Sequence, residues 1–260
     1  MALDEIMRPL TAAPLVGVAA LAVFWENFFG EIAGYFTRVA GRLSWMEKLR
    51  LLRVIEARQE IETVPASYRW TFAVIALVLA ALELSPAVPF IVPFAIMSVA
   101  LACGMLGVYI FLFRRCTPRA ATLARRSVFR ALPAPVLAAL AGSFLITLAL
   151  ALTPGHRFEG IAIALTVLVI AIVSWRIAVA PTLLLGLDPE WEYVVDERLR
   201  IGRARAVVAL GCVIASLFAT VTAPLVAARY AEWIPLLATA CTVVAAFENA
   251  RLQWQEVHPA

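Results

Sequence analysis

The sequence predicts an all-α integral membrane protein with six transmembrane helices and additional amphipathic helices at the membrane surface. Hydrophobic residues make up 63% of the 260 residues, and the mean hydropathy is +0.90. Ordinary soluble domains contain only about 45–50% apolar residues, so lipid rather than water is the expected solvent of this surface. Because each helical span needs about 20 apolar residues, six or seven spans with short loops account for nearly the whole chain.

Six apolar runs are the predicted spans. They cover residues 68–84, 86–113, 131–152, 161–187, 206–226 and 233–247. The runs are rich in Leu, Ala and Val and do not alternate apolar with polar residues, so helices rather than a β-barrel satisfy their backbone hydrogen bonds. The chain therefore divides into an N-terminal segment, residues 1–64, and a six-span domain, residues 65–260.

The basic residues predict the orientation of the spans. Lys and Arg are concentrated in residues 38–69, 114–130 and 198–205, whereas the alternate loops contain only Arg157 and Arg229. Loops rich in Lys and Arg face the cytoplasm. We therefore expect all three basic segments and the C-terminus on the cytoplasmic side, in the plasma (inner) membrane of a bacterium.

Residues 10–36 leave two interpretations open. The apolar run over residues 10–25 is short for a span and leads directly into Glu26, Asn27 and Glu31. One interpretation is an in-plane or re-entrant helix. The other is a seventh, tilted span that packs through Gly30 and Gly34 and places the N-terminus outside.

Ser44 and Glu47 form an S-x-x-E capping box, which predicts a helix that begins at Trp45 and is stopped by Pro65. Its apolar face is Trp45, Leu49, Leu52 and Ile55, and its basic face is Lys48, Arg50, Arg53 and Arg58. This layout is typical of a helix that lies on a membrane surface containing anionic lipid. The alternative is a solvated helix that docks on the protein's own loops.

Two cytoplasmic loops share a pattern 71 residues apart. Thr117–Pro118 and Asp188–Pro189 each combine an N-cap residue with a first-turn proline, so each predicts a charged helix that leads into the next span. In the second helix, acidic residues lie in the first turn and arginines near the end, which complements the helix dipole. The repeated pattern suggests an internal duplication of span, cytoplasmic helix and span.

Arg176 is a charged residue within the fourth predicted span. An arginine near a helix centre costs about 2.5–3.5 kcal/mol on insertion scales, so it needs a partner or a route to the headgroups. Glu248, at the inner end of the sixth span, is the carboxylate at a compatible depth. We expect Glu248, or backbone carbonyls at a helix end, to neutralise Arg176. A substrate-binding role for Arg176 is the alternative.

No pattern in the sequence predicts an enzyme, a metal centre or a cofactor. The two histidines, His156 in an outer loop and His258 near the C-terminus, do not predict a His-based metal site or a bis-histidine haem. The four cysteines stand singly, without metal-ligand spacing, and the chain has no glycine-rich phosphate-binding loop. Because the arginines follow the topology pattern, nucleic acid is not an expected partner.

The polar residues of the predicted spans are mainly Ser and Thr, whereas paths for ions or hydrophilic solutes are usually more polar. We therefore expect a non-catalytic multi-pass subunit, a scaffold or assembly component of a larger membrane complex, whose partners are other membrane subunits. An interfacial N-terminal segment, six spans and a cytoplasmic helix between the second and third spans give a layout that resembles the membrane subunits of ABC-2-type exporters. That resemblance implies an alternative function: a permease subunit for apolar or lipid-like substrates, with a cytoplasmic ATPase as partner.

Overall fold

The computed structural model describes residues 41, 43–62, 66–85, 96, 128–152, 157–180, 185–226 and 233–257. These residues form helices and no strand, which confirms the all-α prediction for this part of the chain. The predictions for residues 10–36, for the helix after Thr117–Pro118 and, apart from Ile96, for the second span lie outside the described residues. Of the first copy of the proposed duplication, the described residues therefore contain the last span but neither the charged helix after Thr117–Pro118 nor, apart from Ile96, the first span.

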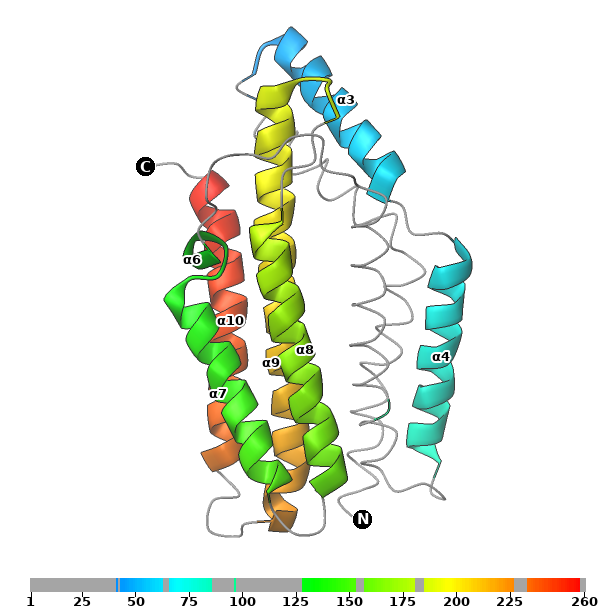
Figure 1. The fold of residues 1–260 in the computed structure, drawn as a ribbon, viewed down its shortest axis with the longest axis vertical. Coiled ribbons are helices and arrows are strands. Elements are labelled where there is room, and N and C mark those ends of the chain that lie inside the picture. Colours follow the sequence, from blue (N-terminus) through cyan, green and yellow to red (C-terminus); the bar gives the residue numbers. More distant parts are fainter. Residues whose placement is uncertain are drawn as a thin grey trace.

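Four long helices form a bundle in which successive helices run in opposite directions (Figure 1). They are α7 (Ala134–Ala151), α8 (Arg157–Val179), α9 (Pro189–Val226) and α10 (Trp233–Val257). The short helix α6 (Val128–Ala131) precedes α7, and α3 (Trp45–Glu62) lies across the end of the bundle where α9 begins. In the same view α4 (Ala66–Leu84) stands apart from the four-helix bundle.

Three of the described helices are long and apolar enough to cross a membrane. They are Ala134–Ala151, Gly160–Val179 and Pro189–Ala219, which lie in α7, α8 and α9. Two further apolar helices, Ala73–Leu82 and Trp233–Glu248, are shorter. These lengths fit a membrane-embedded helical protein and confirm the transmembrane prediction in this coarser form. They do not confirm the six-span count.

Small residues let the helices of the bundle approach closely. Ala204, Ala215 and Ala238 are fully buried in the core, together with the large side chain of Phe218. The closest approach is at Gly160, where an added Cβ would lie 2.5 Å from the Cα of Ala151. Small residues at helix interfaces allow the backbone contacts that stabilise membrane bundles.

The end of α8 differs from the predicted fourth span. The sequence predicted a span over residues 161–187, but α8 ends at Val179, and residues 185–188 are not helical. Pro181 explains the end, because proline disfavours helical backbone in the residue before it. Gly186, with a φ of 79°, has a left-handed conformation that an L side chain rarely adopts. Residues 185–187, the last residues of the predicted span, therefore belong to the connection that precedes α9.

α9 combines two elements that the sequence predicted separately. The charged helix after Asp188–Pro189 and the fifth span, residues 206–226, form one continuous helix of 38 residues. At 1.5 Å per residue this helix is about 57 Å long, nearly twice the thickness of a bilayer's hydrocarbon core. The apolar residues 206–226 alone measure about 31 Å. α9 is therefore longer than one crossing of the hydrocarbon requires, and we call its first part, residues 189–205, the charged segment of α9.

Candidate functional site: an ionic layer at the charged end of the bundle

The N-terminus of α3 forms as the sequence predicted. The Ser44 N–H and hydroxyl donate hydrogen bonds to Oε2 of Glu47, at 2.8 and 2.6 Å, and the Glu47 N–H donates to Oγ of Ser44 at 3.4 Å. These reciprocal bonds are a capping box, and α3 begins at Trp45, the predicted residue. The Ser44 hydroxyl, and then its N–H, lower the pKa of Glu47 below its ordinary value of 4.5.

The buried face of α3 includes only Ile55 of the predicted apolar face. Leu51, Val54 and Ile55 are buried against Val195 and Leu199 of the charged segment of α9. By contrast, Trp45, Leu49 and Leu52 of the predicted face are 72%, 36% and 39% exposed. Apolar residues occur on both sides of this helix, and contact with α9 decides which side is covered.

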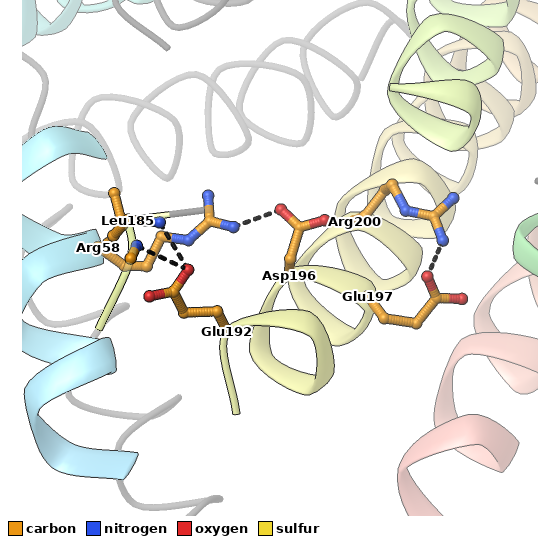
Figure 2. Close-up of polar contacts among 7 residues, drawn as sticks. Arg58, Leu185, Glu192, Asp196, Glu197 and Arg200 are labelled. Carbon is orange, nitrogen blue, oxygen red and sulfur yellow. Dashed lines mark hydrogen bonds and ion pairs between the residues drawn. The ribbon is translucent and has the colours of Figure 1, made fainter. Parts of the chain in front are cut away.

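Arg58 is not part of an exposed basic face. It reaches from α3 to Asp196 of α9 and forms an ion pair with side-chain exposures of only 4% and 11% (Figure 2). A second pair, Arg50 with Asp188, has an N–O distance of 3.7 Å, and here the arginine is exposed. In both pairs the acidic partner lies 138 positions after the arginine. The two arginines are eight residues apart in α3, and their acidic partners are also eight residues apart. The two helical segments therefore run in the same direction and in register.

Glu192 organises the connection between α8 and α9. Its fully buried carboxylate accepts hydrogen bonds from four consecutive backbone N–H groups, of which Figure 2 labels Leu185. Leu185 and Gly186 donate to Oε2 at 2.6 and 3.3 Å, and Leu187 and Asp188 donate to Oε1 at 2.5 and 3.2 Å. Hydrogen bonds of this kind to an ionised carboxylate are strong. The Glu192 side chain thus fixes residues 185–188, the loop that immediately precedes α9.

Arg200 joins the charged segment of α9 to the end of α8. Its guanidinium donates to the carbonyl of Ala178 and pairs with the carboxylate of Glu197 one turn earlier. The same carboxylate lies 3.8 Å from Nε of Arg130 in α6. Because the last carbonyls of a helix have no partners within it, a cation placed there supplies the missing hydrogen bond and complements the helix dipole.

Arg205 joins α9 to two further elements. Its Nε donates to the carbonyl of Ala131 at the end of α6, at 2.9 Å, and its Nη1 donates to the carbonyl of Glu248 in α10, at 2.8 Å. Arg205 is only 7% exposed. Three buried arginines, at positions 58, 200 and 205, thus connect α3, α6, α8, α9 and α10 at one end of the bundle. We call this set of contacts the ionic layer.

The predicted intramembrane pair, Arg176 with Glu248, does not form. Arg176 is exposed on α8 and has no hydrogen bond or ion pair within the described part of the chain. It is Arg205 that bonds to Glu248, through the backbone carbonyl. The sequence did not single out Arg200 or Arg205, because a C-capping contact between distant helices leaves no local pattern.

Two members of the predicted basic face have no contact of this kind. Lys48 is half-buried and Arg53 is exposed, and neither makes a hydrogen bond or ion pair with another residue that the structure describes. The four predicted basic residues therefore have different environments. Arg58 and Arg50 form ion pairs with acidic residues of the α9 region, whereas Lys48 and Arg53 form none with the described residues.

Several hydroxyl groups within the bundle are bonded to their own helices, whereas Ser216 of α9 and Thr239 of α10 are bonded to each other at 3.3 Å. The hydroxyls of Ser174, Thr166 and Thr147 donate to carbonyls three or four residues earlier. Within the described residues no group of three or more His, Cys, Asp or Glu side chains could hold a metal ion. The chemistry that this region offers is hydrogen bonding and charge pairing between helices.

Comparisons of the chain with protein-family models, with curated proteins and with solved structures found no match.

Proposed function

We propose that this chain is a non-catalytic multi-pass membrane subunit, a scaffold or assembly component of a larger membrane complex. The observation that carries the proposal is the ionic layer. Each of its three buried arginines bonds to a carboxylate or a helix-end carbonyl of another element. Buried charges that serve substrates or protons would need an approach path and a free face. Here they are used to fix five helices relative to one another.

The hydroxyl groups of the spans support the same proposal. A permease for hydrophilic solutes lines its path with polar groups that face the solute. In α7 and α8 the hydroxyls of Thr147, Thr166 and Ser174 instead donate to the backbone of their own turns. Such bonds satisfy the hydroxyl donor within its own helix. The helix surface is then suited to packing against other helices and lipid.

The charged end of the bundle is the cytoplasmic end in this proposal. The arginines of the charged segment of α9 lie just beyond the apolar residues 206–226, where the positive-inside rule places cytoplasmic loops. Reporter fusions test this orientation. Fusions after Arg126, Arg205 and Ala260 are expected to be cytoplasmic, and fusions after Gly155 and Arg229 to be on the opposite side. A cytoplasmic signal after Gly155 would contradict the orientation.

Arg176 fits the role of an interfacial anchor better than that of a substrate ligand. Arg200 binds the carbonyl of Ala178, which places the end of α8 beside the charged segment of α9. Arg176 lies two residues earlier, about 3 Å along the helix. From this level an exposed guanidinium reaches lipid phosphates, and the neighbouring Trp175, 50% exposed, is the aromatic type that favours the same depth. Anionic lipid is the expected contact.

Copurification tests the proposal against the exporter alternative. The full chain, tagged and extracted in mild detergent, is expected to copurify in constant stoichiometry with membrane proteins that are not ATPases. Arg200→Met, which removes the bond to the end of α8, is expected to reduce the yield of the complex. Gly202→Ala, a change with no atom within 4 Å of the new Cβ, is the matched control. A stoichiometric ATPase together with ATP-driven export of a lipid-like substrate from liposomes would overturn the scaffold proposal.

A further inference from the structure

The contact between Arg205 and Glu248 sets the register of the antiparallel helices α9 and α10 (Figure 1). Cys212 lies seven positions after Arg205, and Cys241 lies seven positions before Glu248. Seven residues are about two helical turns, so each cysteine stands about 10 Å further into the bundle, on the same face of its helix as the residue that makes this contact. The two cysteines are therefore at one level of the interface between α9 and α10.

A second contact between the same helices agrees with this register. The hydroxyls of Ser216 and Thr239 are 3.3 Å apart. Ser216 lies about one turn beyond Cys212, and Thr239 lies two positions before Cys241. Contacts on both sides thus place Cys212 and Cys241 opposite each other.

Both thiols face the interior of the bundle, and their surroundings allow a close approach. Cys212 is fully buried and belongs to the same core as Ala238 and Ala245, the α10 residues one turn on either side of Cys241. Cys241 is half-buried and packs against this core. Its Sγ would lie 3.0 Å from a Cβ added to Gly142 of α7. Small residues on α7 and α10 therefore bring the helix backbones close together around the two thiols.

Ser143 of α7 adds a hydroxyl to the same place. It follows Gly142 in the chain and is fully buried. Apart from the Cys212 thiol, with which it interacts, no described group is a hydrogen-bond partner of the Ser143 hydroxyl. A buried polar group with so little to bond to is uncommon in a folded protein, and a redox role of its neighbour is one physical reason for it.

A metal ion fits these surroundings less well than a disulfide does. A two-coordinate soft ion such as Cu⁺ binds thiolates, so both thiols would lose their protons and leave a net negative charge in an apolar core. Arg205, two turns away, already donates to the carbonyls of Ala131 and Glu248. A disulfide is uncharged and needs no further ligand.

We propose that Cys212 and Cys241 are a redox-responsive thiol pair, which hydrogen peroxide closes into a disulfide between α9 and α10. Cys241, the more accessible thiol, attacks one oxygen of the peroxide. The O–O bond breaks, Cys241 becomes a sulfenic acid, and one water leaves. The Cys212 sulfur then attacks the Cys241 sulfur, the S–O bond breaks, and the hydroxyl leaves with the Cys212 proton as a second water. The peroxide gains the two electrons that the thiols lose.

The disulfide would fix α10 to α9 beside the ionic layer, two turns from the bond between Arg205 and Glu248. A cross-link of this kind stabilises a fold mainly by restricting its unfolded state. The oxidised chain is therefore expected to unfold at a higher temperature than the reduced chain in the same detergent. This inference goes beyond the proposed function and does not depend on it.

The test uses the full chain in nanodiscs with Cys103→Ser and Cys116→Ser, which leaves Cys212 and Cys241 as its thiols. After treatment with hydrogen peroxide, free thiols are blocked and the denatured chain is digested with trypsin. Cleavage after Arg229 places the two cysteines in separate peptides, residues 206–229 and 230–251. These peptides are expected to stay joined until dithiothreitol separates them. Two unchanged thiols, a sulfinic acid at Cys241 beside a free Cys212, or a disulfide between two copies of the chain would each overturn the proposal.

Two further measurements test the order of the steps and the register. Dimedone, which traps sulfenic acids, is expected to label Cys241 in the Cys212→Ser variant and to leave Cys212 unlabelled in the Cys241→Ser variant. Cys241→Ser combined with Ala245→Cys moves the thiol one turn along the same buried face. Because a disulfide needs closely spaced Cα atoms, this control is expected to lower the disulfide yield at least about tenfold. Equal yields from the two pairs would contradict the placement of Cys212 opposite Cys241.

Discussion

Arg58 and Asp196, 138 positions apart in the chain, meet as a buried ion pair between α3 and the charged segment of α9. Together with the exposed pair of Arg50 and Asp188, it sets the two helices parallel and in register. Burying one charged partner without the other costs free energy. The pair therefore disfavours alternative registers of the two helices more strongly than apolar contacts do. The pair explains how α3 is held against the charged segment of α9.

Removing one partner of the pair should release α3. Asp196→Ala leaves the Arg58 guanidinium buried without its carboxylate, and loss of one partner of a buried pair typically costs about 3–5 kcal/mol. Hydrogen exchange of the α3 amides in detergent measures this change. Arg58→Met with Asp196→Leu is expected to restore most of the protection, and Arg53→Met, at an exposed position, to leave it unchanged. Equal protection in wild type and Asp196→Ala would show that the pair does not hold α3.

Glu192→Gln should loosen the connection between α8 and α9. The amide keeps the size of the side chain but replaces one acceptor oxygen with a donor that faces N–H groups. Hydrogen bonds to a charged group contribute about 1.5–3 kcal/mol each, so a loss of at least about 2 kcal/mol in the stability of this loop is expected. Faster exchange of the Leu185 and Leu187 amides is the readout. Glu190→Gln, on an exposed residue of the same turn, serves as the control.

Two glycine substitutions should act in opposite directions. Gly160→Ala places a Cβ 2.5 Å from the Ala151 backbone, so α7 and α8 must move apart at a cost of about 1–3 kcal/mol. Gly202→Ala adds a Cβ with nothing within 4 Å, and alanine favours the helix by up to about 1 kcal/mol. Thermal unfolding of both variants in the same detergent provides the comparison. Equal unfolding temperatures would contradict the close contact at Gly160.

The capping box should make the start of α3 sensitive to acid. The pKa of Glu47 is lowered in the folded protein by the Ser44 hydroxyl and N–H, so its ionised form stabilises the folded state. This contribution is complete above the ordinary pKa of 4.5 and is lost as the pH falls through the lower folded-state pKa. NMR titration of the Glu47 side chain measures it directly. Ser44→Ala is expected to return the pKa toward 4.5, and a wild-type pKa at or above 4.5 would contradict the capping box.

Local patterns predicted the parts of the fold that depend on neighbouring residues. The S-x-x-E motif located the start of α3 at Trp45, because the capping bonds join residues three apart. Asp188 and Pro189 likewise marked the start of α9. The apolar runs predicted α7, α8 and α9, the three described helices that are long and apolar enough to cross a membrane.

Contacts between distant residues were not predictable from one sequence. Arg58 looked like part of a basic face because nothing near it indicates Asp196, 138 positions later. The face of α3 that packs on α9 was also missed, since Leu49 and Leu51 are equally apolar and only the position of α9 distinguishes them. The predicted fourth span continued past Pro181, whereas α8 ends at Val179, so Arg176 lies in the last turn of the helix.

The proposed function depends most on the division of α9 into a charged segment outside the membrane and an apolar segment within it. Spin labels at Val194 and Val213, both exposed positions of α9, test this division in liposomes. The two sites are 19 residues apart, about 28 Å along one helix. Electron paramagnetic resonance with oxygen and a water-soluble nickel complex measures the depth of each label. The label at Val213 is expected to collide with oxygen and be shielded from nickel, and the label at Val194 to show the reverse. Nickel access at Val213, or hydrocarbon depth at Val194, would contradict the membrane-anchored bundle on which the proposed function depends.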